Sequence, residues 1–340
     1  MSWSNLSGCQ IANKIYKYAQ LTIEKSNRKE FSDYPQWKMQ IGQIDLYKIH
    51  HFDGMAKTSS LKDLEFNMRM IKLEEMPIDH SQYVFEKDID LVLNYNKNDV
   101  EATCQLLDYT LGNTEHPSYK GQNKIELRRS LKKKFNLDCL NFNDVKIGEQ
   151  LILQQYCKLT GKDVWAVKKL KTYRSTIELK NCIPHWINLK TLEFKKVLNI
   201  IENTIVDATP GVKQDKQFSY NLIYNGVSID FGLGGCHACN KPGIYEIKNG
   251  RIIIDLDVSS LYPSIAVTLG LYPEHLGKEF LEVYGWMVKT RLIEKAKPKD
   301  QRDNVIINGF KLALNGSYGK TGEETSFLYD PLYKYKITQL

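Results

Sequence analysis

Two aspartates follow an apolar run in the segment Arg251–Ser264 (RIIIDLDVSSLYPS). The β-branched run Ile252–Ile254 predicts a buried strand, whose period would place Asp255 and Asp257 on one face. A buried carboxylate is costly unless a cation, a hydrogen bond or water compensates it. The next residues, Ser259–Pro263, predict a turn whose backbone N–H groups could hold an anion. A strand, an acid and such a turn indicate divalent-metal and phosphate chemistry.

A cationic group follows on two predicted helices. The first, about Glu279–Lys297, carries Arg291 and Lys295 four residues apart and ends before Pro298. The second runs from about Asn304 to Leu314. One face of it and of its extension presents Lys311, Asn315 and Tyr318. The two helices would form a positive wall for a triphosphate; the alternative is an exposed charged surface.

A third candidate is the pair Tyr95 and Asp99, four residues apart in a helix predicted from Lys87 to Thr110. The helical period predicts one face made of Ile89, Val92 or Leu93, Asn96, Val100, Thr103 and Leu107. The tyrosine and the aspartate would lie together on one side of the helix. The alternative for this pair is a solvated helix face.

These segments resemble motifs of the family B DNA polymerases, most closely those of tailed bacteriophages. The segment DVSSLYPS (257–264) resembles motif A, and NGFKLALNGSYG (308–319) resembles motif B. YNKND (95–99) resembles the third exonuclease motif. FGLGGCH (231–237) resembles the glycine loop between the exonuclease and polymerase domains, or it is a plain β-turn. The resemblance covers most of residues 40–340.

The resemblance implies template-directed transfer of dNMP from dNTP to a primer 3′-OH by a two-metal mechanism. Asp257 would ligate both Mg²⁺ ions, assisted by the Val258 carbonyl. Backbone amides of Ser260, Leu261 and Tyr262 would hold phosphates, and the Tyr262 ring would exclude a ribose 2′-OH. Asp255 is at best a neighbour of the metal ligands.

The other roles also come from the resemblance. The residues that would hold the triphosphate are Arg291, Lys295 and Lys311. The pocket for the nascent base pair would be lined by Asn315, Tyr318 and Gly319. In the exonuclease part, Asp99 would help hold a metal and Tyr95 would orient water. Gly234 and Gly235 would touch the template strand. Gly316 replaces a serine of many relatives, so we expect a looser helix end or a closer approach to the base pair.

The fold implied is α/β (α+β) and multidomain: the C-terminal part of an RNase H-like 3′–5′ exonuclease domain, then an incomplete palm with an antiparallel sheet and helical fingers. The expected divisions are 1–125 (exonuclease-like), 126–215 (basic helical connector), 216–278 (palm), 279–319 (fingers) and 320–340 (truncated return to the palm).

Two expected parts of such a polymerase are missing from the sequence. There is no D-T-D motif C, which would supply a second palm aspartate. The D-x-E at Asp63 and Glu65 lies in a predicted helix, where residues two apart diverge, and too near Asp99, so we reject it as the first exonuclease motif. We therefore expect the chain to begin inside the exonuclease domain. We also expect the isolated chain to be inefficient, needing a companion polypeptide with motif C besides DNA primer–template and dNTP.

The competing interpretation is a non-catalytic nucleic-acid-binding remnant of such a polymerase. It would bind DNA in a salt-sensitive way without depending on Asp257 or Lys311. Basic clusters suit either interpretation, or are only solvated faces: Arg128, Arg129, Lys132, Lys133 and Lys134, then Lys168, Lys169, Lys171 and Arg174 with Trp165 and Tyr173 interleaved.

Composition agrees with a soluble globular protein and is compatible with a phosphate-rich partner. The 340 residues are 42% apolar and 26% charged, with 47 basic against 40 acidic residues, a modest excess of +7. No apolar run approaches the roughly 20 residues of a membrane span, and there is no signal-peptide core. We expect a cytoplasmic protein, in the host cytoplasm if viral. The odd count of seven cysteines suggests reduced thiols, and Cys236–Cys239 (CHAC) is a weak zinc candidate.

Overall fold

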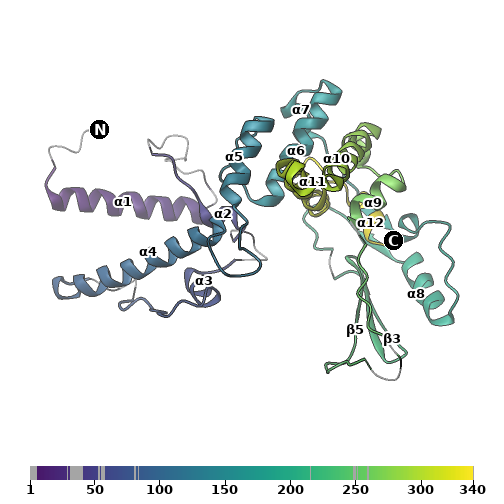
Figure 1. The fold of residues 1–340 in the computed structure, drawn as a ribbon, viewed down its shortest axis with the longest axis horizontal. Helices are drawn as coiled ribbons and strands as arrows, with labels where there is room; N and C mark the ends of the chain where they lie inside the picture. The colour runs from purple at the N-terminus through teal and green to yellow at the C-terminus, as the bar shows by residue number, and fades with distance from the viewer. Residues whose placement is uncertain are drawn as a thin grey trace. The chain divides into compact units, whose positions relative to one another are not determined.

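The computed structural model describes residues 6–28, 30, 41–52, 54, 58–79, 82, 84–214, 216–247, 250, 252–258 and 260–339. The fold is mostly helical with two small antiparallel sheets, which confirms the mixed α+β class (Figure 1). The chain divides into two compact units, Met1–Asp45 and Leu46–Leu340. Among the described residues, none of the helices combines the length and apolarity that crossing a membrane requires.

The first unit contains helix α1 (Gly8–Asn27). Its start is capped by Ser7 and Gln10. The backbone N–H of Gln10 donates to Ser7 Oγ at 3.4 Å, and the backbone N–H of Ser7 donates to the Gln10 side-chain oxygen Oε1 at 2.9 Å. This reciprocal pair satisfies N–H groups that the first helical turn leaves free.

The second unit holds the remaining elements. Its helices are α2 (Leu46–Ile49), α3 (Leu61–Asn67), α4 (Ile89–Leu111), α5 (Lys124–Phe135), α6 (Asp144–Thr160), α7 (Val164–Lys169), α8 (Leu192–Glu202), α9 (Leu261–Thr268), α10 (Lys278–Ala296), α11 (Asn304–Lys320) and α12 (Pro331–Thr338). Short 3₁₀ turns are η2 (Glu86–Asp88), η3 (Leu179–Cys182), η4 (Glu274–Leu276) and η5 (Lys299–Gln301). One sheet pairs β1 (Thr176–Glu178) with β2 (Ile205–Asp207), and the other has the order β3 (Ser219–Tyr224), β4 (Val227–Gly232), β5 (Gly235–Cys239).

Helix α6 lies in the main core, where it packs against both α10 and α11 (Figure 1). Its buried side chains include Ile147, Leu151, Ile152 and Tyr156, all fully inaccessible. The Tyr156 hydroxyl donates to the Leu276 carbonyl at 2.8 Å, so this buried polar tip is satisfied. The predicted basic connector therefore contributes the centre of the core and includes strands β1 and β2 as well as helices.

Glycines set the distance between α6 and α11. A β-carbon on Gly148 would lie 2.7 Å from the carbonyl carbon of Leu312, and one on Gly316 would lie 3.2 Å from Val145 Cα. The two backbones therefore meet in direct contact. The looser helix end predicted at Gly316 is wrong, because Gly316 lies inside α11, which continues to Lys320 rather than stopping near Leu314. Its close contact is with α6, and the alternative of a closer approach to a base pair stays a prediction.

The predicted helix around Tyr95 is confirmed as η2 and α4, but its predicted apolar face is wrong. The buried residues of α4 are Asn98, Ala102, Leu106 and Thr110, each four apart. Ile89 is 46% exposed. Apolar residues occur all round this helix, so the sequence period alone does not select the face that packs on α3 and α5.

The predicted strand Ile252–Ile254 is also wrong. Residues 252–258 form no strand, and the three isoleucines are 71, 63 and 62% exposed. A strand needs a hydrogen-bonded neighbour, and no described residue pairs with this segment. The predicted turn after it is instead the start of α9, with Pro263 inside the helix; Ser259 lies outside the described residues.

His50 joins α2 to α4. Its Nε2 lies 2.8 Å from Thr110 Oγ1, whose own hydroxyl donates to the Leu106 carbonyl, so the ring nitrogen is the donor. The ring also stacks on Phe52 at 5.4 Å. Burial, followed by the positive charge of Lys124, lowers the pKa of His50 to about 4.

We predict that Gly148→Ala destabilises the protein by about 3 kcal/mol, because the new methyl group meets backbone rather than a movable side chain. Gly319→Ala is the matched control on α11, since open space surrounds that position; it should be neutral or stabilise by up to about 1 kcal/mol. Urea unfolding of both variants measures the difference. Equal stability of the two would contradict the close contact.

We predict that stability falls with acidification as His50 titrates. The folded state holds the neutral ring, so this contribution to stability is fully present above pH 6.5 and is lost as the pH falls toward about 4. Denaturation at a series of pH values, with His50→Gln beside the wild type, isolates this contribution. An unchanged pH profile in the variant would show that His50 does not contribute.

Candidate functional site

The start of α9 is the first part of the candidate site. Ser260 has φ of 55° and ψ of 49°, a left-handed conformation that is uncommon for a serine. Leu261 and Tyr262 follow as the first helical residues, and their N–H groups have no partner among the described residues. Free N–H groups at a helix start favour anions, which agrees with the expected phosphate contact.

Arg291 connects three helices at this point. Its Nε donates to the Ile307 carbonyl of α11 at 3.2 Å, and its Nη1 donates to Ser260 Oγ at 3.2 Å. Partial burial lowers the pKa of the Arg291 guanidinium. The structure thus brings a residue of the predicted motif A beside a cation of the predicted fingers.

An aromatic pair makes the second link. The rings of Tyr262 on α9 and Tyr318 on α11 lie 4.3 Å apart between centroids, inclined by 36°. Burial raises the pKa of Tyr318 to about 12. Two tyrosines predicted for one nucleotide pocket therefore touch each other, although they are distant in the sequence.

The remaining predicted residues of this site lie at the surface. Leu261, Lys295, Lys311, Asn315 and Gly319 are exposed, on α9, α10 and α11. Lys311 and Asn315 lie on the exposed side of α11, opposite the buried Phe310 and Leu314. Asp257 is exposed in a segment without strand or helix, and Val258 is 58% exposed.

A second group of charges surrounds the other predicted pair. Lys62 Nζ on α3 lies 2.8 Å from Glu65 Oε1 and 3.0 Å from Asp99 Oδ1, and 4.8 Å from the centre of the Tyr95 ring. Partial burial opposes the charge, but the hydrogen bonds to Glu65 and Asp99 raise the pKa of Lys62 above its usual range. Tyr95 and Asp99 do share one side of α4, as predicted.

Sequence reasoning missed Lys62, because its partner Asp99 lies on another helix and no local spacing relates the two. The rejection of Asp63 with Glu65 as a pair agrees with the structure: Asp63 caps α3 at the surface, whereas Glu65 is fully buried. Glu65 and Asp99 are nevertheless linked, because both carboxylates form an ion pair with Lys62. Its second oxygen, Oε2, is buried without a hydrogen-bond partner.

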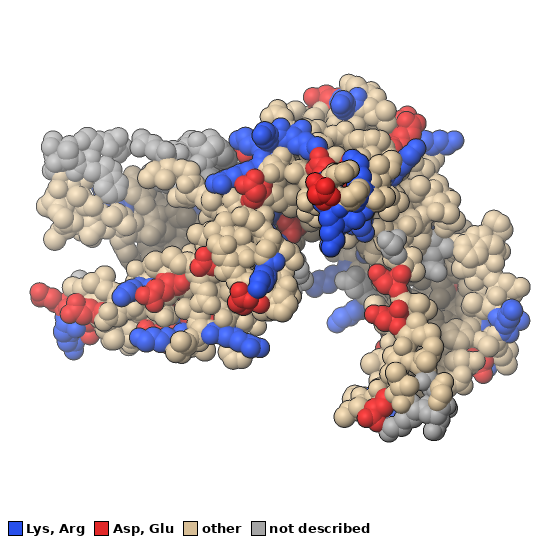
Figure 2. All heavy atoms as spheres, in the orientation of Figure 1, with Lys and Arg blue, Asp and Glu red and all other residues tan. Residues whose placement is uncertain are grey.

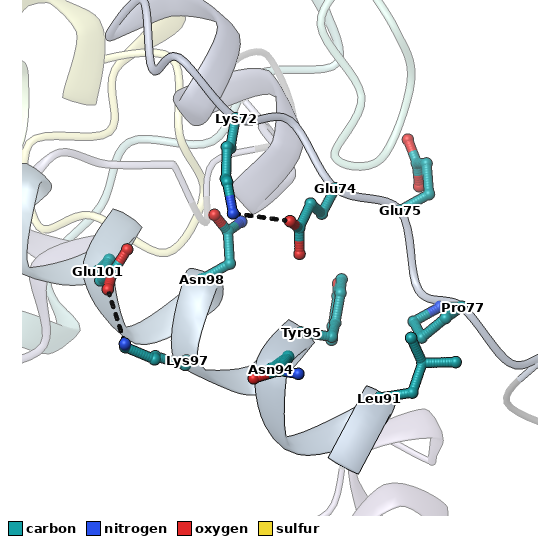
Figure 3. Close-up of a pocket in the computed structure, with 10 residues that line it drawn as sticks. All are labelled: Lys72, Glu74, Glu75, Pro77, Leu91, Asn94, Tyr95, Lys97, Asn98 and Glu101. Atoms are coloured by element: carbon teal, nitrogen blue, oxygen red, sulfur yellow. Dashed lines mark ion pairs between the residues drawn. The ribbon is translucent and has the colours of Figure 1, made fainter. Parts of the chain in front are cut away.

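A pocket of about 620 Å³ lies beside Tyr95 and Asn98 (Figure 3). Its wall is formed by one face of α4 and by the segment 72–77, and its residues are Lys72, Glu74, Glu75, Pro77, Leu91, Asn94, Tyr95, Lys97, Asn98 and Glu101. Each wall carries one ion pair of its own: Lys72 with Glu74 at 3.6 Å in the segment 72–77, and Lys97 with Glu101 at 3.9 Å on α4 (Figure 3). The lining is mixed in charge.

The expected two-metal site is incomplete in the described part of the chain, where no three His, Cys, Asp or Glu side chains gather. Asp257 belongs to no such group, and the Asp99 carboxylate is bound to the Lys62 ammonium. These residues do not by themselves fit two Mg²⁺ ions. The CHAC segment forms β5, where Cys236 and Cys239, three apart, face opposite sides. All seven cysteines are free.

The segment FGLGGCH contains the end of β4, a two-residue hairpin turn at Leu233 and Gly234, and the start of β5, with Gly232 paired to Gly235. Gly235 has φ of 123°, a conformation suited to glycine, and Gly234 is exposed. The turn is held by the end of α12, because the Thr338 hydroxyl donates to the Leu233 carbonyl at 2.9 Å. The geometry is that of the β-turn alternative. Contact of Gly234 and Gly235 with a template strand stays a prediction.

The basic clusters divide between core and surface. Arg128 is buried and donates to Phe142 O at 2.7 Å and to Asp144 Oδ1 at 2.8 Å, so it is neither a phosphate ligand nor part of a solvated face. Lys168 lies 5.0 Å above the ring of Trp165, which is 71% exposed. The Arg174 guanidinium pairs with Glu274.

Comparison with known proteins gives no further guide: no family model matches the chain, and neither a curated protein nor a solved structure is significantly similar to it.

We predict that Lys62→Met destabilises the protein by about 3 kcal/mol, because it leaves the buried Glu65 carboxylate without a counter-charge. The double variant Lys62→Met/Glu65→Leu should recover most of the loss. Chemical denaturation of the two singles and the double completes the cycle. Additive losses would show that the lysine and the glutamate are not coupled.

Proposed function

We propose that this chain is a segment of a family B DNA-directed DNA polymerase that binds the incoming nucleotide and its template. The observation that supports it best is the convergence of Ser260, Tyr262, Arg291 and Tyr318, which come from separate segments of the sequence. A guanidinium, two free N–H groups and an aromatic pair in one place suit a nucleoside triphosphate.

In this proposal the triphosphate binds Arg291 and the start of α9, with Lys295 and Lys311 adding charge from the exposed sides of their helices. Asn315 and Gly319 then face the nascent base pair. The finer fold, an RNase H-like exonuclease remnant followed by a partial palm and fingers, belongs to the same proposal. So does a location in the cytoplasm, of a host cell if the chain is viral.

Catalysis needs carboxylates beyond Asp257 to hold two Mg²⁺ ions. We propose that a companion polypeptide carrying motif C supplies them. The segment next to Asp257 offers it a surface, because Ile252, Ile254 and Leu256 are largely exposed and their backbone has no partner among the described residues. An added strand would cover these side chains and use these backbone groups.

The non-catalytic alternative has its own supporting observation. Lys62 neutralises Asp99, and Asp257 belongs to no cluster of metal-ligating side chains among the described residues, as a remnant that only binds nucleic acid would allow. Dependence of nucleotide binding on Arg291 separates the two interpretations.

We predict that Arg291→Gln weakens dNTP binding about tenfold, equivalent to about 1.4 kcal/mol. Lys289→Gln, an exposed position on the same helix, is the matched control and should change the affinity less than about twofold. Equilibrium titration with a fluorescent dNTP, beside circular dichroism to establish folding, measures both. Equal affinity of the folded variants would overturn the proposed triphosphate site.

We predict Mg²⁺-dependent dNTP incorporation on a primed template when the companion polypeptide is added, and loss of it with Asp257→Ala. The chain alone should incorporate little. Full incorporation by the chain alone would contradict the need for a companion. No incorporation by the mixture, with DNA still bound, would favour the remnant.

A further inference from the structure

Helix α5 presents a basic face that the nucleotide site does not use. Arg129, Lys132 and Lys133 are exposed, at helical spacings of three and four that place them on one side. The helix packs into the protein through Leu131 on the opposite side and through Ile125 one turn before Arg129, both of which are buried. Figure 2 shows Lys and Arg side chains gathered over α5 and again over α10 and α11.

These cations are not neutralised by the fold. Among the described residues, Arg129 and Lys133 have no acidic partner. Lys132 reaches Asp138 at 3.3 Å, but both side chains are largely exposed, so the pair is weak and screened by salt. In contrast, Lys124 and Arg128 of the same helix are paired with Asp144.

The position of α5 is fixed between two helices of interest. It packs against α4, which carries Tyr95 and Asp99, and against α11, which carries Lys311. On the α11 side, the Phe135 and Phe310 rings lie 5.9 Å apart and Lys134 pairs with Asp303, the cap of α11. The exposed cations of α5 are therefore held at a fixed place beside both helices.

We infer that the α5 face binds the phosphate backbone of single-stranded nucleic acid as it passes between α11 and α4. The three cations span about 6 Å along the helix axis, and with the reach of their side chains they suit about two or three successive phosphates of one strand. The identity of the polyanion rests on the proposed function. The surface itself rests on the exposed charges and the packing of α5.

The test is fluorescence anisotropy of the whole chain with a labelled single-stranded oligonucleotide of about 20 nucleotides, at several salt concentrations between about 50 and 200 mM. The triple variant Arg129→Gln/Lys132→Gln/Lys133→Gln removes the face. If each cation neutralises about one phosphate, the slope of log K against log salt should fall in magnitude by about 2 in this variant. Affinity at the lowest salt should fall at least about tenfold.

The matched control is Lys190→Gln/Lys195→Gln/Lys196→Gln, which removes the same charge from exposed positions at and before α8. It should keep the wild-type slope. Equal losses in the two triples, or wild-type binding by a folded α5 triple, would overturn the inference. The α5 triple should still bind fluorescent dNTP normally, so failure of this surface and failure of the nucleotide site are distinguishable.

Discussion

Helices α6 and α11 touch backbone to backbone at Gly148, where a β-carbon would overlap the Leu312 carbonyl group. This contact determines where α11 lies, and α11 in turn carries Tyr318 and receives the Arg291 hydrogen bond. A methyl group added at Gly148 would push α11 away from α6 and so shift Tyr318 and the Ile307 carbonyl relative to the start of α9. Helix packing in the core therefore controls the geometry of the candidate nucleotide site.

Buried charge supports the same arrangement from the other side. Arg128 on α5 donates to the Phe142 carbonyl and the Asp144 carboxylate, so it ties α5 to the start of α6. A buried guanidinium is stable only when its hydrogen-bond partners are in place, so these bonds fix both the distance and the orientation of α5 relative to the start of α6. The exposed cations of α5 are consequently presented on a helix that is fixed to the core.

Local rules predicted the helices around Tyr95 and on either side of Pro298, but they missed α9, which was predicted as a turn, and the end of α11. Pro298 follows the end of α10, and Asp303 caps α11, because its Oδ1 accepts hydrogen bonds from the backbone N–H groups of Val305 and Ile306. The starts and ends of α9 and α11 also bring together the tyrosines that the sequence assigned to one site. Prediction failed where a distant partner decides the outcome: Gly316 is tolerated within α11 because α6 needs the space, and Asn98 is buried because of how α4 packs.

The need for a distant partner also explains why Lys62 was missed, since no local pattern relates it to Asp99. It likewise explains the isoleucines 252–254, whose β-propensity is not met by a neighbouring strand among the described residues. Propensity indicates what a segment can form; a partner decides whether it forms. The charge pattern of α5 had a comparable ambiguity, since the sequence does not show that Arg128 turns inward while Arg129 turns outward.

The exposed run 252–258 has a practical consequence for handling the protein. A β-branched, largely apolar segment whose backbone groups have no partner among the described residues is a template for strands of other molecules, including further copies of itself. At high concentration the purified chain would therefore self-associate through this segment, with the two aspartates opposing close stacking through their charge. Association would weaken on dilution.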